Sequence, residues 1–448
     1  MKEILKEVIE ERAQELKGMA KKIWDNPELG YEEFFASKLQ SDYMEKNGFA
    51  IREVLNLPTA FIAEYGEGGP VVGVLGEYDA LPGFSQLEGV TFKAATESEN
   101  PNGHGCGHNL LGVAGIGACL AIKEAIDRGI VRCRIRYYGC PAEELLTGKV
   151  RMEEEGVFKD LDLALSYHPS DKNAVWAMKT PAMIRANFNF EGTEAHAGYN
   201  PEDGRSALDA VELMNIGSNY LREHMSRTSR IHYTITDGGK APNIVPGEAS
   251  SSYHIRSESK ESVEALYERV VKVARGAAMM TETEVEVDFI GEIYDYEPSN
   301  VLKGVAKENL EFAGKILLTD EEKNYARELS ATIDPKMRER ARKAIGLEEE
   351  EVFSTRKIMI EVEPVGGATD VGNVSYIAPT IIISTACMPA GISPHSWQAT
   401  ASFGSELGLK GMIHGSKAMA GTIWDVCTDR ELLERIIKDH REKALKQG

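Results

Sequence analysis

The chain has 448 residues, more than a single hydrophobic core usually serves, and this length predicts two or three domains, with two as the working count. Hydrophobic residues make up 42% and charged residues 27%, a globular composition that excludes disordered, collagen-like and fibrous chains. The formal net charge of −20 argues against nucleic acid and anionic membranes, because both need a basic patch, and favours a small-molecule partner.

The N-terminus predicts a cytoplasmic protein. Residues 1–24 form a charged amphipathic pattern without the apolar stretch of a signal peptide, and no window approaches membrane-spanning length. The six cysteines are scattered at no framework spacing, so disulfides are not expected in a reducing compartment. Any cysteine with a special role is therefore expected to be a metal ligand or a nucleophile.

The first part of the chain alternates helical patterns with short apolar runs. Such alternation predicts an α/β sandwich, because each buried strand needs helices to cover it. The predicted helices span 3–23, 33–47 and 109–126, and the predicted strands span 71–76, 132–139 and 161–167.

The pattern changes near residue 184 to strand, helix, strand, strand, helix, strand, which is the order of a ferredoxin-like module. These elements are expected at 184–192, 206–221, 231–236, 248–257, 261–278 and 284–290. The first pattern then resumes, with charged surface helices in 319–351 and a strand at 380–385. We therefore expect a domain at 184–296 inserted into a discontinuous domain of 1–183 and 297–448.

The densest chemical motif is GHGCGHNL, which places His104, Cys106 and His108 within five residues between glycines. Thiolate and imidazole together suit zinc or a similar transition metal. The alternative from the motif alone is a turn with incidental polar residues. A papain-like nucleophile is disfavoured because no supporting motif accompanies Cys106.

Further candidates follow predicted strands. Glu143 and Glu144 come after RCRIRYYG, His168 follows LDLALSY, and His395 lies in the loop GISPHSW after TIIIST. Adjacent carboxylates are usually solvated and a lone histidine is usually structural. Ligands of open α/β sheets, however, bind at the carboxyl ends of strands, so the convergence of these residues predicts a shared metal site.

These motifs resemble the aminoacylase and carboxypeptidase superfamily of dinuclear metallopeptidases, in the amidohydrolase branch that carries Cys-Gly-His in place of a bridging aspartate. GHGCGHNLLG, YGCPAEE, GRSALDAVELMN, APNIVP and ATDVGNVSY are similar to the p-aminobenzoyl-glutamate hydrolase group of that branch. The resemblance implies a phosphorylase/hydrolase-like α/β/α catalytic domain with an inserted ferredoxin-like α+β lid domain for dimerisation.

The resemblance also implies two divalent metal ions, manganese or zinc with cobalt as an alternative. Cys106 would bridge them, with His108 and His168 on one ion and Glu144 and His395 on the other. Glu143 would be the general base.

One position departs from the superfamily pattern. A His-x-Asp motif usually follows an early strand, but here the sequence reads Glu77-Tyr78-Asp79. Glu77 is therefore not assigned as a ligand, His108 is expected to replace the missing histidine, and Asp79 is expected to orient a ligand.

The inserted domain adds three candidates by the same resemblance. His196 would reach the site of a second protomer and stabilise the oxyanion, Asn243 would donate a hydrogen bond there, and Arg256 would bind a substrate carboxylate. Without the resemblance these residues read as an exposed loop histidine, a turn asparagine and a surface arginine.

Two glycine-containing segments need separate interpretation. Residues 366, 367, 369 and 370 form a flexible segment in which Gly367 and Thr369 are candidates to line the substrate pocket, with an ordinary turn as the alternative. The glycines of LLGVAGIGACL superficially resemble a phosphate loop but do not follow a strand, so we attribute them to close packing of a buried helix.

The sequence thus predicts a metal-dependent amidohydrolase that acts on small N-acyl or N-aroyl amino acids, with p-aminobenzoyl-glutamate as the preferred substrate. The alternatives are a dipeptidase, a deacylase of a conjugate such as indole-acetyl-aspartate, and a non-catalytic metal-binding scaffold. A homodimer through the lid domain is expected, and a related second subunit is an open alternative.

Overall fold

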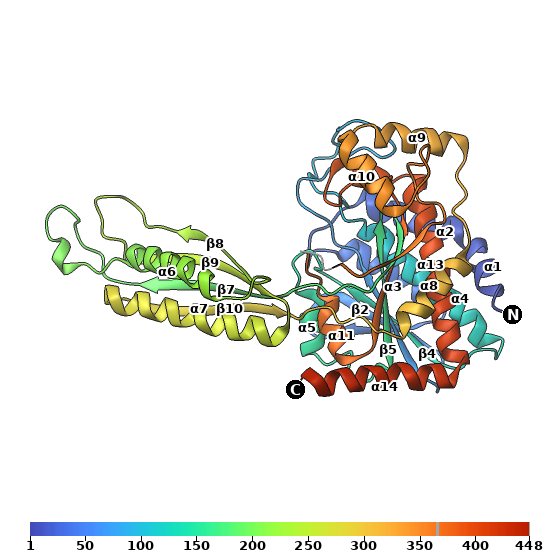
Figure 1. Ribbon diagram of the computed structural model, residues 1–448, viewed down its shortest axis with the longest axis horizontal. Coiled ribbons are helices and arrows are strands. Elements are labelled where there is room, and N and C mark those ends of the chain that lie inside the picture. Colours follow the sequence, from blue (N-terminus) through green and yellow to red (C-terminus); the bar gives the residue numbers. More distant parts are fainter. Residues whose placement is uncertain (364–366, 448) are drawn as a thin grey trace. The chain divides into compact units, whose positions relative to one another are not determined.

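The computed structural model describes residues 1–363 and 367–447 of the chain (Figure 1). The chain divides into two compact units: unit 1 is Met1–Met178, Glu297–Glu363 and Val374–Gly448, and unit 2 is Lys179–Tyr296 and Pro364–Asn373. Unit 2 thus begins a few residues before the expected boundary at 184, because its first strand already pairs at Ala182.

Unit 1 is built on an eight-stranded sheet of order β1-β2-β4-β3-β5-β12-β6-β11. The strands are β1 (Ala50–Val54), β2 (Leu57–Tyr65), β3 (Val71–Glu77), β4 (Arg134–Cys140), β5 (Leu163–Ser170), β6 (Asn173–Trp176), β11 (Ile358–Glu361) and β12 (Thr380–Ala386). Neighbours among the central strands β4, β3, β5 and β12 pair in parallel, and every residue of β3 and β12 is buried. Both faces of the sheet are covered at these two strands, so their successive side chains can be apolar and need not alternate with polar ones.

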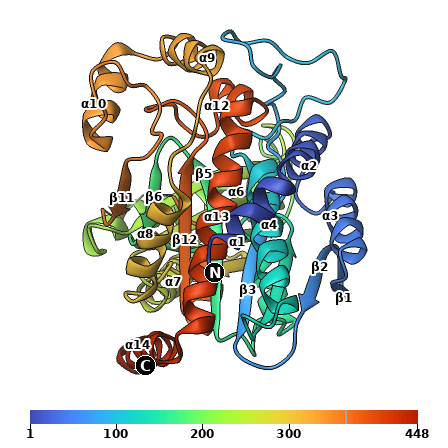
Figure 2. The same cartoon turned by 90° about the vertical axis from the view of Figure 1, so that its right-hand side faces the viewer.

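Helices surround this sheet (Figure 2). They are α1 (Ile4–Glu11), α2 (Ala13–Asp25), α3 (Phe34–Lys46), α4 (His108–Asp127), α5 (Gly148–Glu154), α8 (Leu302–Ala313), α9 (Asp320–Ser330), α10 (Pro335–Ile345), α11 (Val371–Ile377), α12 (Trp397–Phe403), α13 (Glu406–Thr428) and α14 (Arg430–Gln447). Helices α4 and α13 pack against each other, α4 on β3 and α13 on β12. The expected α/β class is confirmed.

The glycines of α4 serve close packing, as the sequence indicated. A Cβ on Gly115 would lie 2.8 Å from Val74, and one on Gly117 would lie 2.7 Å from Ser416 on α13. The expectation that no window approaches membrane-spanning length was wrong, since helix α4 is long and apolar enough by length and composition; most of it is buried inside the protein.

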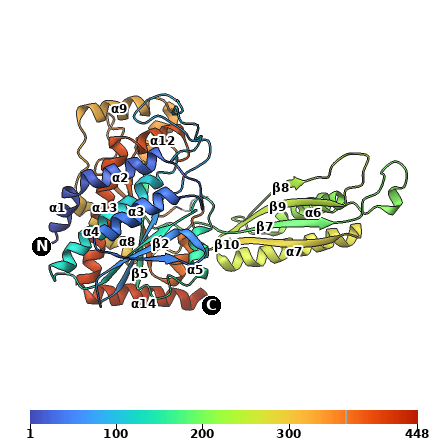
Figure 3. The ribbon, with the colours of Figure 1, turned by 180° about the vertical axis from the view of Figure 1, so that it is seen from behind.

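Unit 2 has the predicted β-α-β-β-α-β order. Its elements are β7 (Ala182–Glu191), α6 (Ala207–Leu221), β8 (Arg230–Asp237), β9 (Glu248–Ser257), α7 (Lys260–Thr281) and β10 (Glu284–Ile293), with short 3-10 turns at Pro201–Asp203 and Arg222–His224. The strands form an antiparallel sheet of order β10-β7-β9-β8, and α6 and α7 pack together on it (Figure 3). Alternating burial along β7 and β9 shows that one face of this sheet contacts the helices.

Several elements of the structure differ from those predicted from the sequence. The predicted helix 3–23 is two helices separated at Arg12, and His168, expected just after a strand, lies within β5. Strands β1, β2, β6 and β11 were not predicted; β1 is largely exposed and β6 is short, so neither has a clear apolar signature. The predicted surface helices in 319–351 are confirmed, since α9 and α10 bury few side chains.

Candidate metal centre

The predicted ligands of unit 1 meet at one edge of its sheet. Cys106 and His108 stand at the start of α4, Glu144 follows β4, His168 lies near the end of β5, and His395 lies in the loop after β12. Because neighbouring parallel strands end on the same side, residues far apart in sequence arrive at one place.

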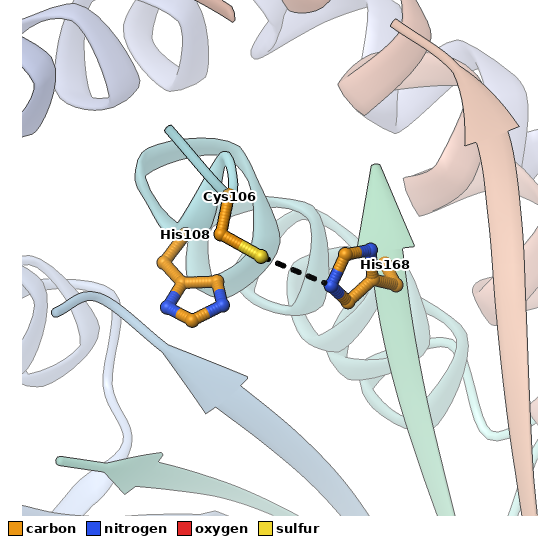
Figure 4. Close-up of side chains that lie close together, drawn as sticks. All are labelled: Cys106, His108 and His168. Atoms are coloured by element: carbon orange, nitrogen blue, oxygen red, sulfur yellow. Dashed lines mark hydrogen bonds between the residues drawn. The ribbon is translucent and has the colours of Figure 1, made fainter. Parts of the chain in front are cut away.

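Two ligand groups share the Cys106 thiol. In the first, the ligand atoms of Cys106, His108 and His168 lie within 4.8 Å of one another, and Cys106 Sγ is 3.5 Å from His168 Nε2 (Figure 4). In the second, Cys106 groups with Glu144 and His395, whose Oε1 and Nε2 are 3.5 Å apart. A thiolate shared by two groups is the arrangement that a bridge between two ions requires.

Local backbone geometry brings the loops together. Gly107 has φ 82°, and a Cβ there would lie 2.6 Å from the Pro169 side chain, so glycine allows α4 to begin against the end of β5. His395 itself has φ 55°, and its N–H donates to the Gly105 carbonyl at 2.9 Å. A non-glycine residue in this conformation is held by its surroundings, here by the loop that carries Cys106.

Neighbouring groups orient two of the imidazoles. His168 Nδ1 lies 2.8 Å from the Pro169 carbonyl, which only accepts, so Nδ1 carries the proton and Nε2 is left as the donor to a metal. His108 Nδ1 lies 2.8 Å from Asp79 Oδ1, while Asp79 Oδ2 accepts the N–H of Glu144 at 2.8 Å. Asp79 therefore contacts two predicted ligands at once.

The electrostatics fit a bound cation. Burial by itself would raise the pKa of Glu144, but the nearby His395 imidazole and the charge of His108 lower it to about 2. Burial lowers the pKa of His168 and the charge of His108 lowers it further, which favours the neutral imidazole that binds metals. Burial, then the charge of Glu144, raises the pKa of the Cys106 thiol, and a divalent cation would reverse this by favouring the thiolate.

Two ligand atoms are buried without hydrogen-bond partners among residues 1–363 and 367–447: His108 Nε2 and Glu144 Oε1. Buried polar atoms of this kind are costly unless something binds them. Together with the thiol and imidazole donors, they show that this donor set fits divalent metal ions.

Glu77 and Lys149 form a buried ion pair beside the ligands. Lys149 Nζ lies 2.6 Å from Glu77 Oε1, and Glu77 Oε2 lies 3.4 Å from His108 Nε2. Burial would raise the pKa of Glu77, but the charges of Lys149 and then His108 outweigh it, so the pKa lies below its ordinary value. Glu77 also groups with His108 and Glu143. Lys149 was missed by sequence reasoning, because a lysine in a short helix carries no pattern that distinguishes it from a surface residue.

His104, the first residue of the motif, lies apart from both ligand groups. Its Nε2 contacts the Ile23 carbonyl at 3.1 Å, and burial, with the charge of His108, lowers its pKa to about 3. It is a neutral core histidine, and only two of the three motif residues belong to the candidate ligand groups.

His196 and Asn243 lie together in unit 2. The Ala197 N–H donates to the Asn243 carbonyl at 3.0 Å, and His196 Nδ1 accepts the Gly198 N–H at 3.2 Å. Both side chains are exposed within this unit. They stand beside the end of β9 that begins at Glu248.

Arg256 lies at the other end of β9, half-buried and opposite Met183. It is eight residues from Glu248, which is roughly 26 Å along a strand. Arg256 and His196 of one chain are therefore too far apart to contact the same small molecule.

The residues predicted to line a substrate pocket in the segment before α11 differ in their placement. Residue 366 lies outside the described residues, and Gly367 is exposed. Thr369 is buried, and its hydroxyl accepts the Val371 N–H at 3.3 Å, so it contributes to the start of α11. The role of Gly367 and Thr369 in a substrate pocket stays a prediction.

Comparison with known proteins shows which family this chain belongs to. Residues 180–279 match the peptidase dimerisation domain of the M20 family. The chain is 38% identical to one of the p-aminobenzoyl-glutamate hydrolase subunits of Escherichia coli, over 97% of this chain and 94% of that protein. This chain belongs to the M20 family. It is therefore a hydrolase that acts on amide bonds.

Two further relatives fit this M20 assignment. Human Xaa-Arg dipeptidase is 30% identical over 98% of this chain and 91% of its own. A dinuclear metal binding M20 peptidase from Bacillus subtilis has the same fold, with a TM-score of 0.61 at 17% identity over 92% of this chain and 98% of its own. The expected fold and family are confirmed.

Proposed function

We propose that this M20 enzyme hydrolyses the amide bond of small N-acyl or N-aroyl amino acids, with p-aminobenzoyl-glutamate as the preferred substrate. The observation that carries the reaction is the Cys106 thiol shared by two ligand groups, with Glu143 beside them. The preferred substrate is supported by the 38% identity to the E. coli p-aminobenzoyl-glutamate hydrolase protein over almost the whole chain.

The centre is proposed to hold two divalent ions, manganese or zinc, with cobalt as an alternative. Cys106 would contact both, His108 and His168 would complete one site, and Glu144 and His395 would complete the other. Bound there, the ions would supply Lewis acidity that lowers the pKa of water and polarises the substrate carbonyl. Imidazole, thiolate and carboxylate suit several such metals, so availability contributes to the choice.

Glu143 is proposed as the proton carrier. Its Oε2 lies 3.8 Å from His108 Nε2, and its side chain is partly exposed, so it lies next to the ligands and remains open to water. It would take a proton from the attacking water and pass it to the leaving nitrogen, first as base and then as acid. Glu77 contacts Lys149 and Asp79 contacts His108, so these two carboxylates are assigned supporting roles.

Unit 2 is proposed to complete the site as a lid in a homodimer. Arg256 would bind the substrate carboxylate through its guanidinium, and His196 and Asn243 would stabilise the oxyanion at the partner's centre. The separation of His196 and Arg256 along β9 supports the use of two chains, and the match to a peptidase dimerisation domain supports the interface.

A cytoplasmic location is proposed, supported by six free cysteines. The E. coli relative is named as one subunit of its hydrolase, so for this protein too we propose that a related second subunit exists. The partners we propose include neither nucleic acid nor a membrane, in keeping with the net charge of −20.

The test is release of free amino acid from a panel of N-aroyl and N-acyl amino acids and dipeptides, using protein loaded with manganese, zinc or cobalt. Turnover of p-aminobenzoyl-glutamate above all other members supports the proposal. Preference for a dipeptide would favour the second candidate, a dipeptidase, which the 30% identity to human Xaa-Arg dipeptidase supports. Silence with every metal would contradict both.

A further inference from the structure

A second buried carboxylate reaches the loop that carries Glu143. Glu33 stands at the start of α3, is fully buried, and accepts the Ala142 N–H on Oε1 at 2.7 Å. The sequence separates these two residues by 109 positions. Glu33 belongs to neither ligand group.

The residues on both sides of Glu143 are therefore held by carboxylates through their N–H groups. Glu33 accepts the N–H of Ala142, and Asp79 accepts the N–H of Glu144 at 2.8 Å. The Leu146 N–H closes the turn by donating to the Glu143 carbonyl at 2.6 Å. Because the backbone is held before and after Glu143, the direction in which its Cα–Cβ bond leaves the backbone is fixed.

The conformation of this loop needs such support. Ala142 has φ 52°, a left-handed backbone conformation that a residue with a Cβ rarely adopts without outside contacts. Gly148, at the far end of the loop, leaves no space for a side chain, since a Cβ would lie 1.6 Å from the Pro141 carbonyl oxygen. The loop is thus both strained and tightly enclosed.

The segment that carries Glu33 is itself anchored. Glu28 accepts the N–H groups of Phe35 and Ala36 at 2.9 and 3.0 Å, and its carbonyl accepts the Ala80 N–H at 2.7 Å. Tyr31 donates its hydroxyl hydrogen to Thr147 at 2.7 Å, which gives the segment a second contact with the Glu143 loop. Glu33 therefore lies in a segment that is held in place by hydrogen bonds of its own.

Burial of the Glu33 carboxyl group is also energetically unfavourable. Its Oε2 has no hydrogen-bond partner among the residues that the structure describes, and burial, with the charge of Asp79, raises the pKa of the carboxyl to about 7. A side chain that served only to fill this space would be better apolar.

We propose that Glu33 is a positioning residue that holds the Ala142 peptide and so keeps Glu143 aimed at the reacting water. This inference rests on the proposed function, because it assigns proton transfer to Glu143. It requires Glu33 to act through backbone geometry, without contact to metal or substrate.

The test uses the full-length, metal-loaded enzyme and three variants. Glu33→Met fills the space without an acceptor, Glu33→Gln keeps an acceptor oxygen, and Glu32→Met makes the matched change at the exposed neighbour. We expect Glu33→Met to lower kcat on the order of 100-fold, with KM changed less than about threefold and both metals retained. Glu33→Gln should stay within about fivefold of wild type, and Glu32→Met should match wild type.

Amide hydrogen exchange of residues 141–147 tests the anchor separately from turnover. Faster exchange in Glu33→Met but not in Glu32→Met supports it even if the wild type cleaves no member of the panel, which would count against the proposed function alone. Unchanged exchange, wild-type kcat in Glu33→Met, loss of metal together with kcat, or failure of Glu33→Gln to restore activity would each overturn the positioning role.

Discussion

The ligand cluster of unit 1 and the candidate substrate residues of unit 2 differ in how they are held. His108 is buried and contacts Asp79, and His168 contacts the Pro169 carbonyl. His196 and Asn243 have exposed side chains in unit 2, and the hydrogen bond from the Ala197 N–H to the Asn243 carbonyl joins the loops that carry them. The two histidines of unit 1 are thus oriented by neighbouring acceptors, whereas the side chains of His196 and Asn243 are open to solvent within unit 2.

This difference predicts that changes in unit 1 act on metal content and chemistry, while changes in unit 2 act on turnover with the metals in place.

The largest effect is expected at Glu143. Glu143→Ala should lower kcat by about 10⁴-fold, because it removes the group that moves the proton. Metal analysis of the same sample should find both ions, and Glu154→Ala on the exposed side of α5 is the control. Metal loss in Glu143→Ala would make it a ligand instead.

Cys106 and His395 separate the two ligand groups. Cys106→Ala should reduce the content of both ions, since its thiol belongs to both groups, whereas His395→Ala should reduce one. Each lost ligand is expected to weaken binding by at least 10- to 100-fold, as loss of an orienting neighbour already does. Metal titration with elemental analysis measures this, with Cys119→Ala as a buried-thiol control. Equal loss in both variants would contradict separate sites.

His196 tests the exposed region. His196→Ala should lower kcat by about 10²- to 10³-fold, the usual effect of removing one oxyanion donor, with both metals retained. His224→Ala, another exposed histidine of unit 2, should leave kcat unchanged. In dimers that mix His196→Ala with Glu143→Ala chains, activity should return in the one site that has both intact residues. No recovery would count against action across chains.

The smallest effect expected is on acid stability of unit 1. Burial, then the charges of Lys417 and Lys6, lowers the pKa of His414 to about 4. The unfolded chain takes up the proton below about pH 6.5 while the folded chain does not, so stability present above that pH is lost as pH falls toward 4. Between pH 7.5 and pH 5 the loss is about 2 kcal/mol. Urea unfolding should show that His414→Gln reduces the loss of stability between pH 7.5 and pH 5 by about 2 kcal/mol relative to wild type, and His224→Gln should leave it unchanged.

Prediction and structure agree best where a segment has both a clear polarity pattern and the residue types that begin or end its element. The β-α-β-β-α-β order of unit 2 was readable because its strands alternate in polarity and its helices have N-cap residues such as Ser206 and Ser259. The exposed strand β1 and the break at Arg12 were not predicted, because neither has a strong periodic or breaker signal.

What the sequence by itself determined is the family, the fold class and the set of candidate ligands, since Cys106, His108, Glu144, His168 and His395 stand in motifs or near the ends of buried strands. Only the tertiary structure decided which neighbours hold them. The ion pair of Lys149 with Glu77 and the hydrogen bond from Ala142 to Glu33 join segments distant in sequence. Such contacts depend on how the loops fold over the sheet edge, and no local spacing encodes them.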